Sequence, residues 1–486
     1  MGSVPTEGTG LFSQPSSRSR VNEVMRVKGC LLLVAAATAS AQTSAPLPVG
    51  RVVERVASES DPSQTYALYL PTAYDPARRW PVLLVFDPGG RALTSLELFR
   101  EPAERHGWIV MSSYETRSSD RDDPNVKAVN AMWPDAHLRF AADPRRIYAA
   151  GFSAGAHIAW TLATRTGQVA GVIASGGRFI PQILPDKPSF ASFAAAGDAD
   201  FNFAGTRQTD AFLAKFGAPH RFEVFDGPHR WPPPELATLA VEWMELQAMR
   251  QGLRPRDDGF VEALYRAEIE ASRALEADSR LLDALRRYQA ITRDFTGLRD
   301  TSESSREAKR LEGSAATAAQ ITEERRWERY EERWSASLSR VVGELVNLDP
   351  PPPTSRLLSD LEIAKLKRLA AEGGIAGATA RRLLASASTT MASFLTRRLL
   401  AEQRLPPAIR ALEVAVAIRP EDAVAWYNLA CVRARAGQTR AAIEALTAAL
   451  DRGFNDAALM ETDPDFASLR GHEAYQKLLL RLRPQP

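Results

Sequence analysis

Blocks of apolar residues recur along the first half of the chain, and they predict strands separated by helices. Seven short blocks have the length and composition of strands, at residues 66–70, 82–86, 108–111, 147–150, 169–174, 190–196 and 221–225. Three segments have the length and spacing of helices, at residues 125–140, 154–166 and 235–249. This alternation predicts an α/β fold with a mostly parallel sheet covered on both faces.

The strand pattern stops after about residue 250, and the rest of the chain predicts helices. Residues 260–346 are rich in charge and nearly free of glycine. Trp327, Tyr330 and Trp334 recur at spacings of three and four, so they share one helix face, which indicates packing rather than a binding role. Four prolines at 350–353 form a stiff break between helical blocks.

An internal repeat marks the C-terminal region. Three positions recur after a shift of 34 residues: Ala408, Leu412 and Ala415 become Ala442, Leu446 and Ala449. The period and the alternation of small and large residues resemble the tetratricopeptide repeat. Two repeats are fewer than a free-standing array needs, so we expect them to stack on the preceding helices, with residues 466–480 as a terminal cap.

The N-terminal residues have the pattern of an export signal. Arg26 and Lys28 precede an apolar run at 30–37, and the small residues 39–41 follow it. The run is too short for a membrane anchor, and Met25 is a candidate for the true start. A tail with a chance alanine-rich stretch is the alternative.

Cysteine content and charge limit the possible environments and partners. Cys30 would leave with the signal, which leaves Cys431 unpaired in a predicted helix and the mature chain without a disulfide. Such a chain suits the periplasm or the outside of a bacterium. The formal net charge is +2 with no large block of one sign, so nucleic acid is not an expected partner.

The sharpest motif is Gly151-Phe152-Ser153-Ala154-Gly155, between a predicted strand and a predicted helix. A serine at such a turn is held in a strained conformation, and glycines two residues to either side relieve the crowding. We therefore predict that Ser153 is a nucleophile. A glycine-rich turn without chemistry is the alternative.

A serine nucleophile needs a base, and His229 is the best placed of six histidines. It follows the last strand by a short turn, at the edge where the carboxyl ends of parallel strands meet. The other histidines precede the motif, lie in its helix, lie at the opposite end of the sheet or lie in the repeats: His106, His137, His157, His220 and His472.

Two aspartates are candidates for the acid that orients the histidine. Asp198 and Asp200 both follow the strand at residues 190–196. Asp200 reaches farther past the turn and is preferred, because Asp198 is placed to accept hydrogen bonds from the turn backbone. The order serine, aspartate, histidine is that of an α/β-hydrolase.

An oxyanion needs two backbone N–H donors. The first is expected from Ala154 at the start of the helix. Gly89 or Gly90, in the turn after the strand at residues 82–86, is expected to provide the second, since Pro88 has no N–H group. A plain tight turn is the alternative for this stretch.

These residues together resemble a known group of enzymes. The matching segments are 66–71, 81–87, 143–148, 151–155, 197–200 and 227–232, and they look like the compact α/β-hydrolases of the polyhydroxybutyrate depolymerase, feruloyl esterase and dienelactone hydrolase group. The resemblance covers residues 50 to 250 and implies hydrolysis of acyl esters through an acyl-enzyme. The chain departs from it in the oxyanion loop, where many relatives have a His-Gly pair in place of residues 87–90.

Four segments follow: a leader at 1–41, a hydrolase domain at 42–250, a helical region at 251–385 and repeats at 386–486. Only a short stretch separates Gly177 from the strand that starts near residue 190, so we expect an open cleft unless the helical half covers it. Trp133 and Trp231 are candidates for its walls.

The expected function is that of an exported serine esterase. It needs no cofactor or metal, acts on a small or polymeric ester, and has repeats that bind a protein or peptide or only pack. A peptidase with the same triad and a non-catalytic interaction scaffold are the alternatives.

Overall fold

The structure is a computed structural model, and it describes residues 47–118, 124–178 and 188–482. The predicted leader at 1–41, with Cys30 and Met25, lies outside the described residues. So does most of the stretch between Gly177 and residue 190.

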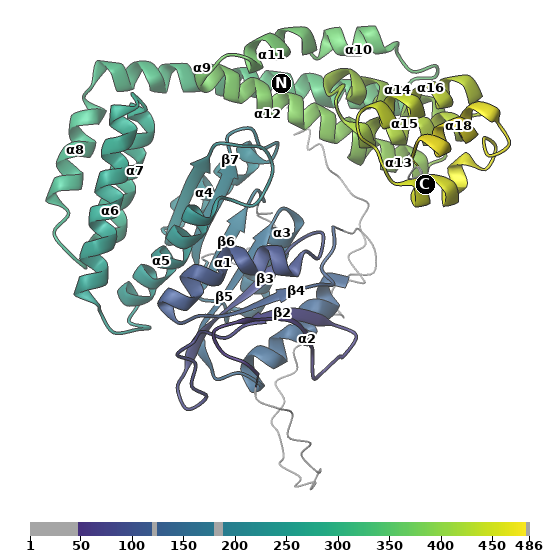
Figure 1. Ribbon diagram of the computed structural model, residues 1–486. Helices are drawn as coiled ribbons and strands as arrows, with labels where there is room; N and C mark the ends of the chain where they lie inside the picture. The colour runs from purple at the N-terminus through teal and green to yellow at the C-terminus, as the bar shows by residue number, and fades with distance from the viewer. Residues whose placement is uncertain (1–46, 119–123, 179–187, 483–486) are drawn as a thin grey trace, which may run out of the picture. The chain divides into compact units, whose positions relative to one another are not determined.

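An eight-stranded sheet forms the centre of the first half (Figure 1). Its strands are β1 (Val52–Ala57), β2 (Thr65–Tyr69), β3 (Trp80–Phe86), β4 (Ile109–Ser113), β5 (Ala142–Phe152), β6 (Gly171–Ser175), β7 (Ala191–Gly197) and β8 (His220–Phe225). The strand order is β1-β2-β4-β3-β5-β6-β7-β8. Only the pairings β1–β2 and β2–β4 are antiparallel. The mostly parallel sheet confirms the predicted α/β fold class.

The described residues of this half form the helices α1 (Ala92–His106), α2 (Pro124–Leu138), α3 (Ala154–Thr166), α4 (Phe203–Lys215) and α5 (Pro234–Arg250). Helices α1 and α5 pack together and share one core with one face of the sheet. Helices α2, α3 and α4 also pack against strands. The centre of the sheet is buried throughout, since every residue of β3 is buried, as its unbroken apolar sequence predicts.

Three elements of this half have no counterpart in the sequence prediction: β1, α1 and α4. Strand β1 is an edge strand in which only one residue is buried, so it has no apolar run. Helix α1 contains Pro102, and neither α1 nor α4 has a side-chain cap at its start. The local signals for these elements are therefore weak.

The second half is helical, as predicted. Its helices are α6 (Asp258–Ala277), α7 (Leu281–Phe295), α8 (Ser302–Glu312), α9 (Ala315–Asn347), α10 (Thr354–Asp360), α11 (Ile363–Ala370), α12 (Gly374–Thr389), the π-helix η2 (Thr390–Leu395), α13 (Thr396–Ala401), α14 (Leu405–Ile418), α15 (Ala423–Arg435), α16 (Thr439–Asp451), α17 (Ala457–Thr462), the short 3-10 helix η3 (Pro464–Phe466) and α18 (Glu473–Leu482).

The buried core of the sheet does not end at residue 250. One continuous cluster joins Phe193 of β7 and Trp243 of α5 to Tyr288 and Phe295 of α7. The indole Nε1 of Trp243 also donates a hydrogen bond to Asp294 (2.8 Å). Helices α6 to α8 therefore complete the core of the first half, while residues 334 to 479 form a second cluster.

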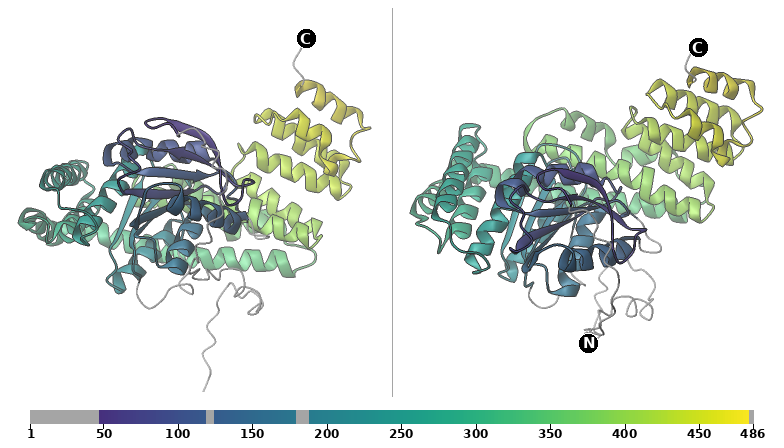
Figure 2. Two further views of the ribbon diagram at one scale, coloured as in Figure 1. Left: turned by 90° about the horizontal axis from the view of Figure 1, so that it is seen from below. Right: turned by 60° about the horizontal axis from the view of Figure 1, so that its bottom comes forward.

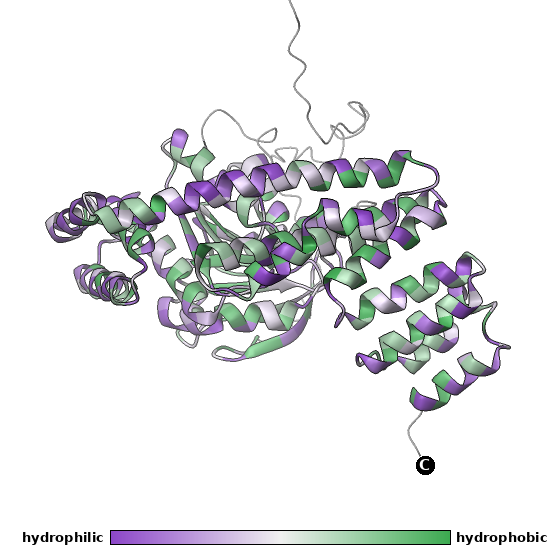
Figure 3. Ribbon diagram, turned by 90° about the horizontal axis from the view of Figure 1, so that it is seen from above, coloured by the Kyte–Doolittle hydropathy of each residue, from purple (hydrophilic) through white to green (hydrophobic). Residues whose placement is uncertain are grey.

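Helix α9, of 33 residues, contributes to both clusters. Ile321 packs against the first, and Trp334 and Leu345 are buried in the second. Figure 3 shows the middle of α9 as hydrophilic, with hydrophobic residues more frequent toward its C-terminal end. Trp334 is buried and donates to the carbonyl of Leu361 (2.8 Å), and Tyr330 is half-buried against the same cluster, so these two residues of the aromatic stripe are packing residues.

Helices α14 and α16 carry the six positions of the sequence repeat, and α15 lies between them in the chain. The six repeat positions are all fully buried: Ala408, Leu412, Ala415, Ala442, Leu446 and Ala449. Figure 2 shows these helices beside one another near the C-terminus. Cys431 is buried in α15 without a disulfide. In the described part of the chain, no helix has both the length and the apolar character that crossing a membrane requires.

Candidate active site

Ser153 occupies the turn between β5 and α3 in a conformation that non-glycine residues rarely adopt. Its φ is 53° and its ψ is −116°. Such a conformation costs about 1–3 kcal/mol and persists only where its surroundings enforce it. The N–H of Ser153 donates to the carbonyl of Ser175 at the end of β6 (2.8 Å), which fixes the turn against the neighbouring strand.

The two glycines of the motif have a direct steric cause. A Cβ atom on Gly151 would lie 2.1 Å from the carbonyl oxygen of Gly155. A Cβ atom on Gly155 would lie 1.9 Å from the carbonyl oxygen of Phe86, the last residue of β3. Both positions exclude any side chain, so the spacing of the motif follows from how tightly α3 packs against β5 and β3.

Asp200 and His229 form a hydrogen-bonded pair at the carboxyl ends of β7 and β8. Nδ1 of His229 lies 2.8 Å from Oδ1 of Asp200. Asp200 is fully buried, and its Oδ1 also accepts the N–H of Asn202 (2.7 Å). Since Nδ1 carries the proton shared with the carboxylate, Nε2 of His229 is left as the basic nitrogen. The side chain of His229 is 18% exposed and thus accessible from solvent.

The serine and the histidine lie at the same edge of the sheet. The ring of His229 packs against the rings of Phe152 (centroids 4.5 Å apart) and Phe201 (4.2 Å apart). Phe152 directly precedes Ser153. No hydrogen bond joins Ser153 to His229 among the described residues, and such catalytic bonds are often formed only once substrate is bound.

Gly176 belongs to the same site, and the sequence prediction did not include it. It follows β6 with a φ of +55°, and a Cβ atom there would lie 2.7 Å from Oδ2 of Asp200 and 3.0 Å from Nδ1 of His229. A side chain at this position would therefore push the pair apart. The pair of glycines at 176 and 177 after an apolar strand was the available signal.

Asp198 has a different environment from Asp200. Its Oδ1 accepts the N–H of Gly227 (3.0 Å), and its Oδ2 lies 3.1 Å from the guanidinium of Arg381. It therefore joins two backbone turns and has no hydrogen bond to His229.

The turn after β3 contains Gly89 and Gly90, the two predicted candidates for the second oxyanion donor. Gly89 donates its N–H to Oδ1 of Asp87 (2.8 Å), and Gly90 donates to the carbonyl of Asp87 (3.0 Å). Neither predicted donor is free, because the buried carboxyl and carbonyl groups of Asp87 already accept from both. The N–H of Ala154 differs, since a first-turn N–H group has no acceptor within its own helix.

Asp87 is the residue around which this turn is built. It is fully buried, and its carboxylate accepts from Gly89, from the guanidinium of Arg91 (2.9 and 3.0 Å) and from the indole Nε1 of Trp231 (2.7 Å). Burial alone would raise the pKa of Asp87, but these hydrogen bonds outweigh it and hold the pKa below its ordinary value. Its position directly after an apolar strand was the sequence signal.

The two predicted wall residues differ in position. Trp231 lies beside the site, with its ring packed against Phe152 (5.7 Å) and Phe99 (6.0 Å). Trp133 lies in α2, where its ring packs against His137 (4.5 Å). The described contacts therefore place Trp231, and not Trp133, next to Phe152 and the turn of Ser153.

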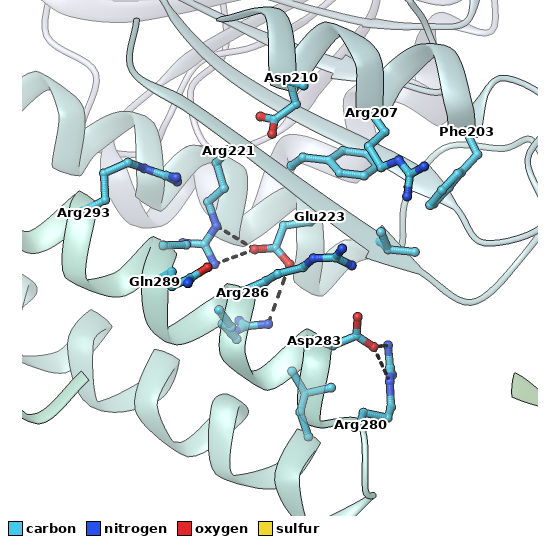
Figure 4. A pocket seen from close by; sticks show the side chains of 16 residues that line it. Phe203, Arg207, Asp210, Arg221, Glu223, Arg280, Asp283, Arg286, Gln289 and Arg293 are labelled. Carbon is cyan, nitrogen blue, oxygen red and sulfur yellow. Dashed lines mark hydrogen bonds and ion pairs between the residues drawn. The ribbon is translucent and has the colours of Figure 1, made fainter. Parts of the chain in front are cut away.

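Other polar clusters in the described residues lie apart from this site. Cys431, Asp463 and Asp465 have ligand atoms close enough together to hold a metal ion, and burial raises the pKa of the Cys431 thiol. A cavity of about 490 Å³ lies between α4, β8 and α7 (Figure 4). Its many arginines pair with acidic groups, as Arg221 does with Glu223 and Glu268, and its lining includes none of Ser153, Asp200 and His229.

Proteins similar to this chain are found only among solved structures. No family model matches the chain, and no curated protein matches it. The fluorophosphonate-binding serine hydrolase FphF of Staphylococcus aureus has 14% identity and a TM-score of 0.35, covering 40% of this chain and 99% of its own. An esterase from the archaeon Pyrobaculum calidifontis has 14% identity and a TM-score of 0.34, covering 41% and 87%. Esterase 2 of Thermogutta terrifontis has 19% identity and a TM-score of 0.32, covering 40% and 92%.

Proposed function

We propose that this chain is an exported serine hydrolase that cleaves carboxylic esters through an acyl-enzyme. The observation that carries the proposal is the 2.8 Å hydrogen bond between His229 and buried Asp200, at the same sheet edge as the strained turn of Ser153. A serine turn, an accessible histidine and a buried carboxylate in that order are what nucleophilic acyl transfer requires.

Each residue has one role in the proposed reaction. Oγ of Ser153 bonds to the ester carbonyl carbon while its proton passes to Nε2 of His229. Asp200 holds the imidazole and stabilises its charged form. The bond to the alcohol then breaks, and the alcohol leaves with the proton from His229. Water repeats the sequence on the acyl-enzyme and releases the acid.

The oxyanion is held by the N–H of Ala154 at the N-terminus of α3, where the helix dipole adds positive potential. A second donor from the turn after β3 requires Gly89 or Gly90 to exchange its Asp87 acceptor for the substrate oxygen. Trp231, which packs against Phe152, forms one wall of the acyl site. Trp133 of α2 stays a candidate for a second wall of the cleft.

Export and the role of the repeats are parts of the same proposal. Residues 1–41 direct the chain to the periplasm or the outside of the cell. The helices from α14 onward are tetratricopeptide-like and offer a face to a protein or peptide partner. Their burial of alanines at close helix contacts supports the first part of this assignment.

Hydrolysis of model substrates tests the proposed activity. We expect the full chain to cleave short-chain nitrophenyl esters and to leave peptide anilides uncleaved, and Ser153→Ala to remove the esterase activity. Cleavage of the anilides would assign a peptidase instead. Activity that survives in Ser153→Ala would contradict the proposed nucleophile.

A further inference from the structure

Helix α12 of the helical half contacts the segment that carries Asp200 (Figure 1). The guanidinium of Arg381 lies 3.1 Å from Oδ2 of Asp198. The neighbouring Arg382 donates to the carbonyl oxygen of Asp198 (2.9 Å), and its guanidinium lies 4.3 Å from the centre of the Phe203 ring. Asp198 and Phe203 flank Asp200, so α12 holds this segment on both sides of the acid.

The same carboxylate extends the contact to the segment that carries the base. Oδ1 of Asp198 accepts a hydrogen bond from the N–H of Gly227 (3.0 Å), and Gly227 lies two residues before His229. The N–H of Ala199 in turn donates to the carbonyl of Gly227 (3.0 Å). A Cβ atom on Gly197 would lie 2.2 Å from that carbonyl, so the two turns pack without space between them. A shift of Asp198 would therefore displace both the turn of Asp200 and the turn of His229.

Helix α12 is itself a firmly packed element. Ala380, Leu383 and Ala387 are buried in the C-terminal core. Arg382 also pairs with Glu331 of α9 (3.1 Å) and donates to Thr379 (3.0 Å). The contact with the first half is therefore made by a fixed surface.

A second set of ion pairs fixes α9 to the first half. Arg207 of α4 lies 2.7 Å from Glu328 and 3.6 Å from Glu324, both on α9. Helix α4 begins at Phe203, three residues after Asp200. The segment between β7 and α4 is thus bonded to α12 through Asp198, and the helix that follows it is paired with α9.

We infer that Arg381 and Asp198 are positioning residues for the triad, and that the helical half completes the catalytic unit by fixing the turns of Asp200 and His229. This inference rests on the proposed function. Neither residue contacts the reacting atoms. Their ion pair is part-exposed and adds little stability, whereas a displacement of about 1 Å in a catalytic group costs about 10²-fold in rate.

Kinetics of full-length variants test the inference. We expect Arg381→Ala to lower kcat about tenfold or more with KM changed less than twofold, because the chemistry and not the binding is disturbed. Asp198→Asn keeps the size of the side chain and an acceptor for Gly227, and it should lower kcat in the same direction. Arg381→Lys should restore part of the loss. The double variant should be no slower than the slower single variant, since both remove one interaction.

Arg398→Ala is the matched control. Arg398 of α13 is an exposed arginine paired with Glu402, which directly follows that helix, so its loss should leave kcat unchanged. Thermal unfolding is measured for each variant, and Asp198→Asn decides the case if Arg381→Ala does not fold. A kcat within twofold of wild type for Asp198→Asn or a folded Arg381→Ala overturns the inference, as does an equal loss in Arg398→Ala. A wild-type chain that cleaves no ester and accepts no fluorophosphonate overturns the proposed function instead.

Discussion

The indole Nε1 of Trp231 donates a 2.7 Å hydrogen bond to the buried carboxylate of Asp87. This bond joins the turn after β3, where the oxyanion site was predicted, to the loop that carries His229. Asp87 also accepts from Arg91 and Gly89, so one charge organises both loops. Asp87 therefore holds the turn after β3 and the loop of His229 together.

The low pKa of Asp87 predicts a pH-dependent contribution to stability. Because its folded-state pKa lies below the unfolded value, the ionised form stabilises the fold above about pH 4, and this stability is lost as pH falls through the folded-state pKa. Asp87→Asn should lower the free energy of unfolding at pH 7 by about 1–3 kcal/mol. Its difference from wild type should shrink below pH 4, as measured by urea unfolding.

Glu97→Gln provides the control for Asp87→Asn. Glu97 pairs with Arg100, and both side chains are about half exposed. This pair should contribute less than about 1 kcal/mol at any pH. A difference between Asp87→Asn and wild type that persists unchanged at pH 3 would contradict the account of Asp87.

The two aspartates after β7 are separated by their contacts with His229. Asp200→Asn should lower kcat on the order of 10⁴-fold, because the amide favours the wrong tautomer of the imidazole. Asp198→Asn should cost much less, since Asp198 acts only through the turns. Steady-state kinetics on one ester compares them, and a larger loss for Asp198→Asn would reverse their roles.

Gly155 should tolerate no side chain. A Cβ atom would lie 1.9 Å from the backbone carbonyl of Phe86, which no side-chain rotation relieves. Gly155→Ala should therefore lower the free energy of unfolding by about 3 kcal/mol or more, or prevent folding. Gly343→Ala in α9 meets no atom within 4 Å and should stabilise by about 0.5–1 kcal/mol. Equal stability of the two variants in thermal unfolding would contradict this steric account.

A fragment that ends at residue 250 should not fold well. It would expose Trp243 and leave buried Arg221 without its partners Glu268 and Asp294. Unpaired buried charge and lost apolar burial each cost several kcal/mol. Residues 48–313 keep α6 to α8 and should give more soluble protein with a higher melting temperature. A stable, cooperatively unfolding 48–250 fragment would show that the first half is independent of these helices.

The sequence pattern was sufficient for elements whose signal is local. The central strands are unbroken apolar runs, and the motif around Ser153 consists of five consecutive residues. The histidine and aspartate candidates followed from their positions after strands. Strand β1 and helix α1 were not predicted, because an exposed edge strand and a proline-containing helix lack a clear hydrophobic period.

Interactions between distant segments left no such signal. Arg381 and Asp198 are 183 residues apart, and one arginine among many in a helical region does not identify its partner. The hydrogen bonds from Gly89 and Gly90 to Asp87 depend on the backbone conformation of the turn. The sequence also did not predict that the core continues beyond residue 250. The hydrophobic pattern changes there from that of strands to that of helices, but the buried core does not end there.

Covalent labelling with a fluorophosphonate probe tests the central claim most directly. The account predicts that the full chain gains the mass of one probe, that peptide mapping places it on Ser153, and that His229→Ala labels far more slowly. Ser153→Ala should gain no mass at all. An adduct on another residue, or a wild-type chain that remains unlabelled while folded, would contradict the assignment of Ser153 as the nucleophile.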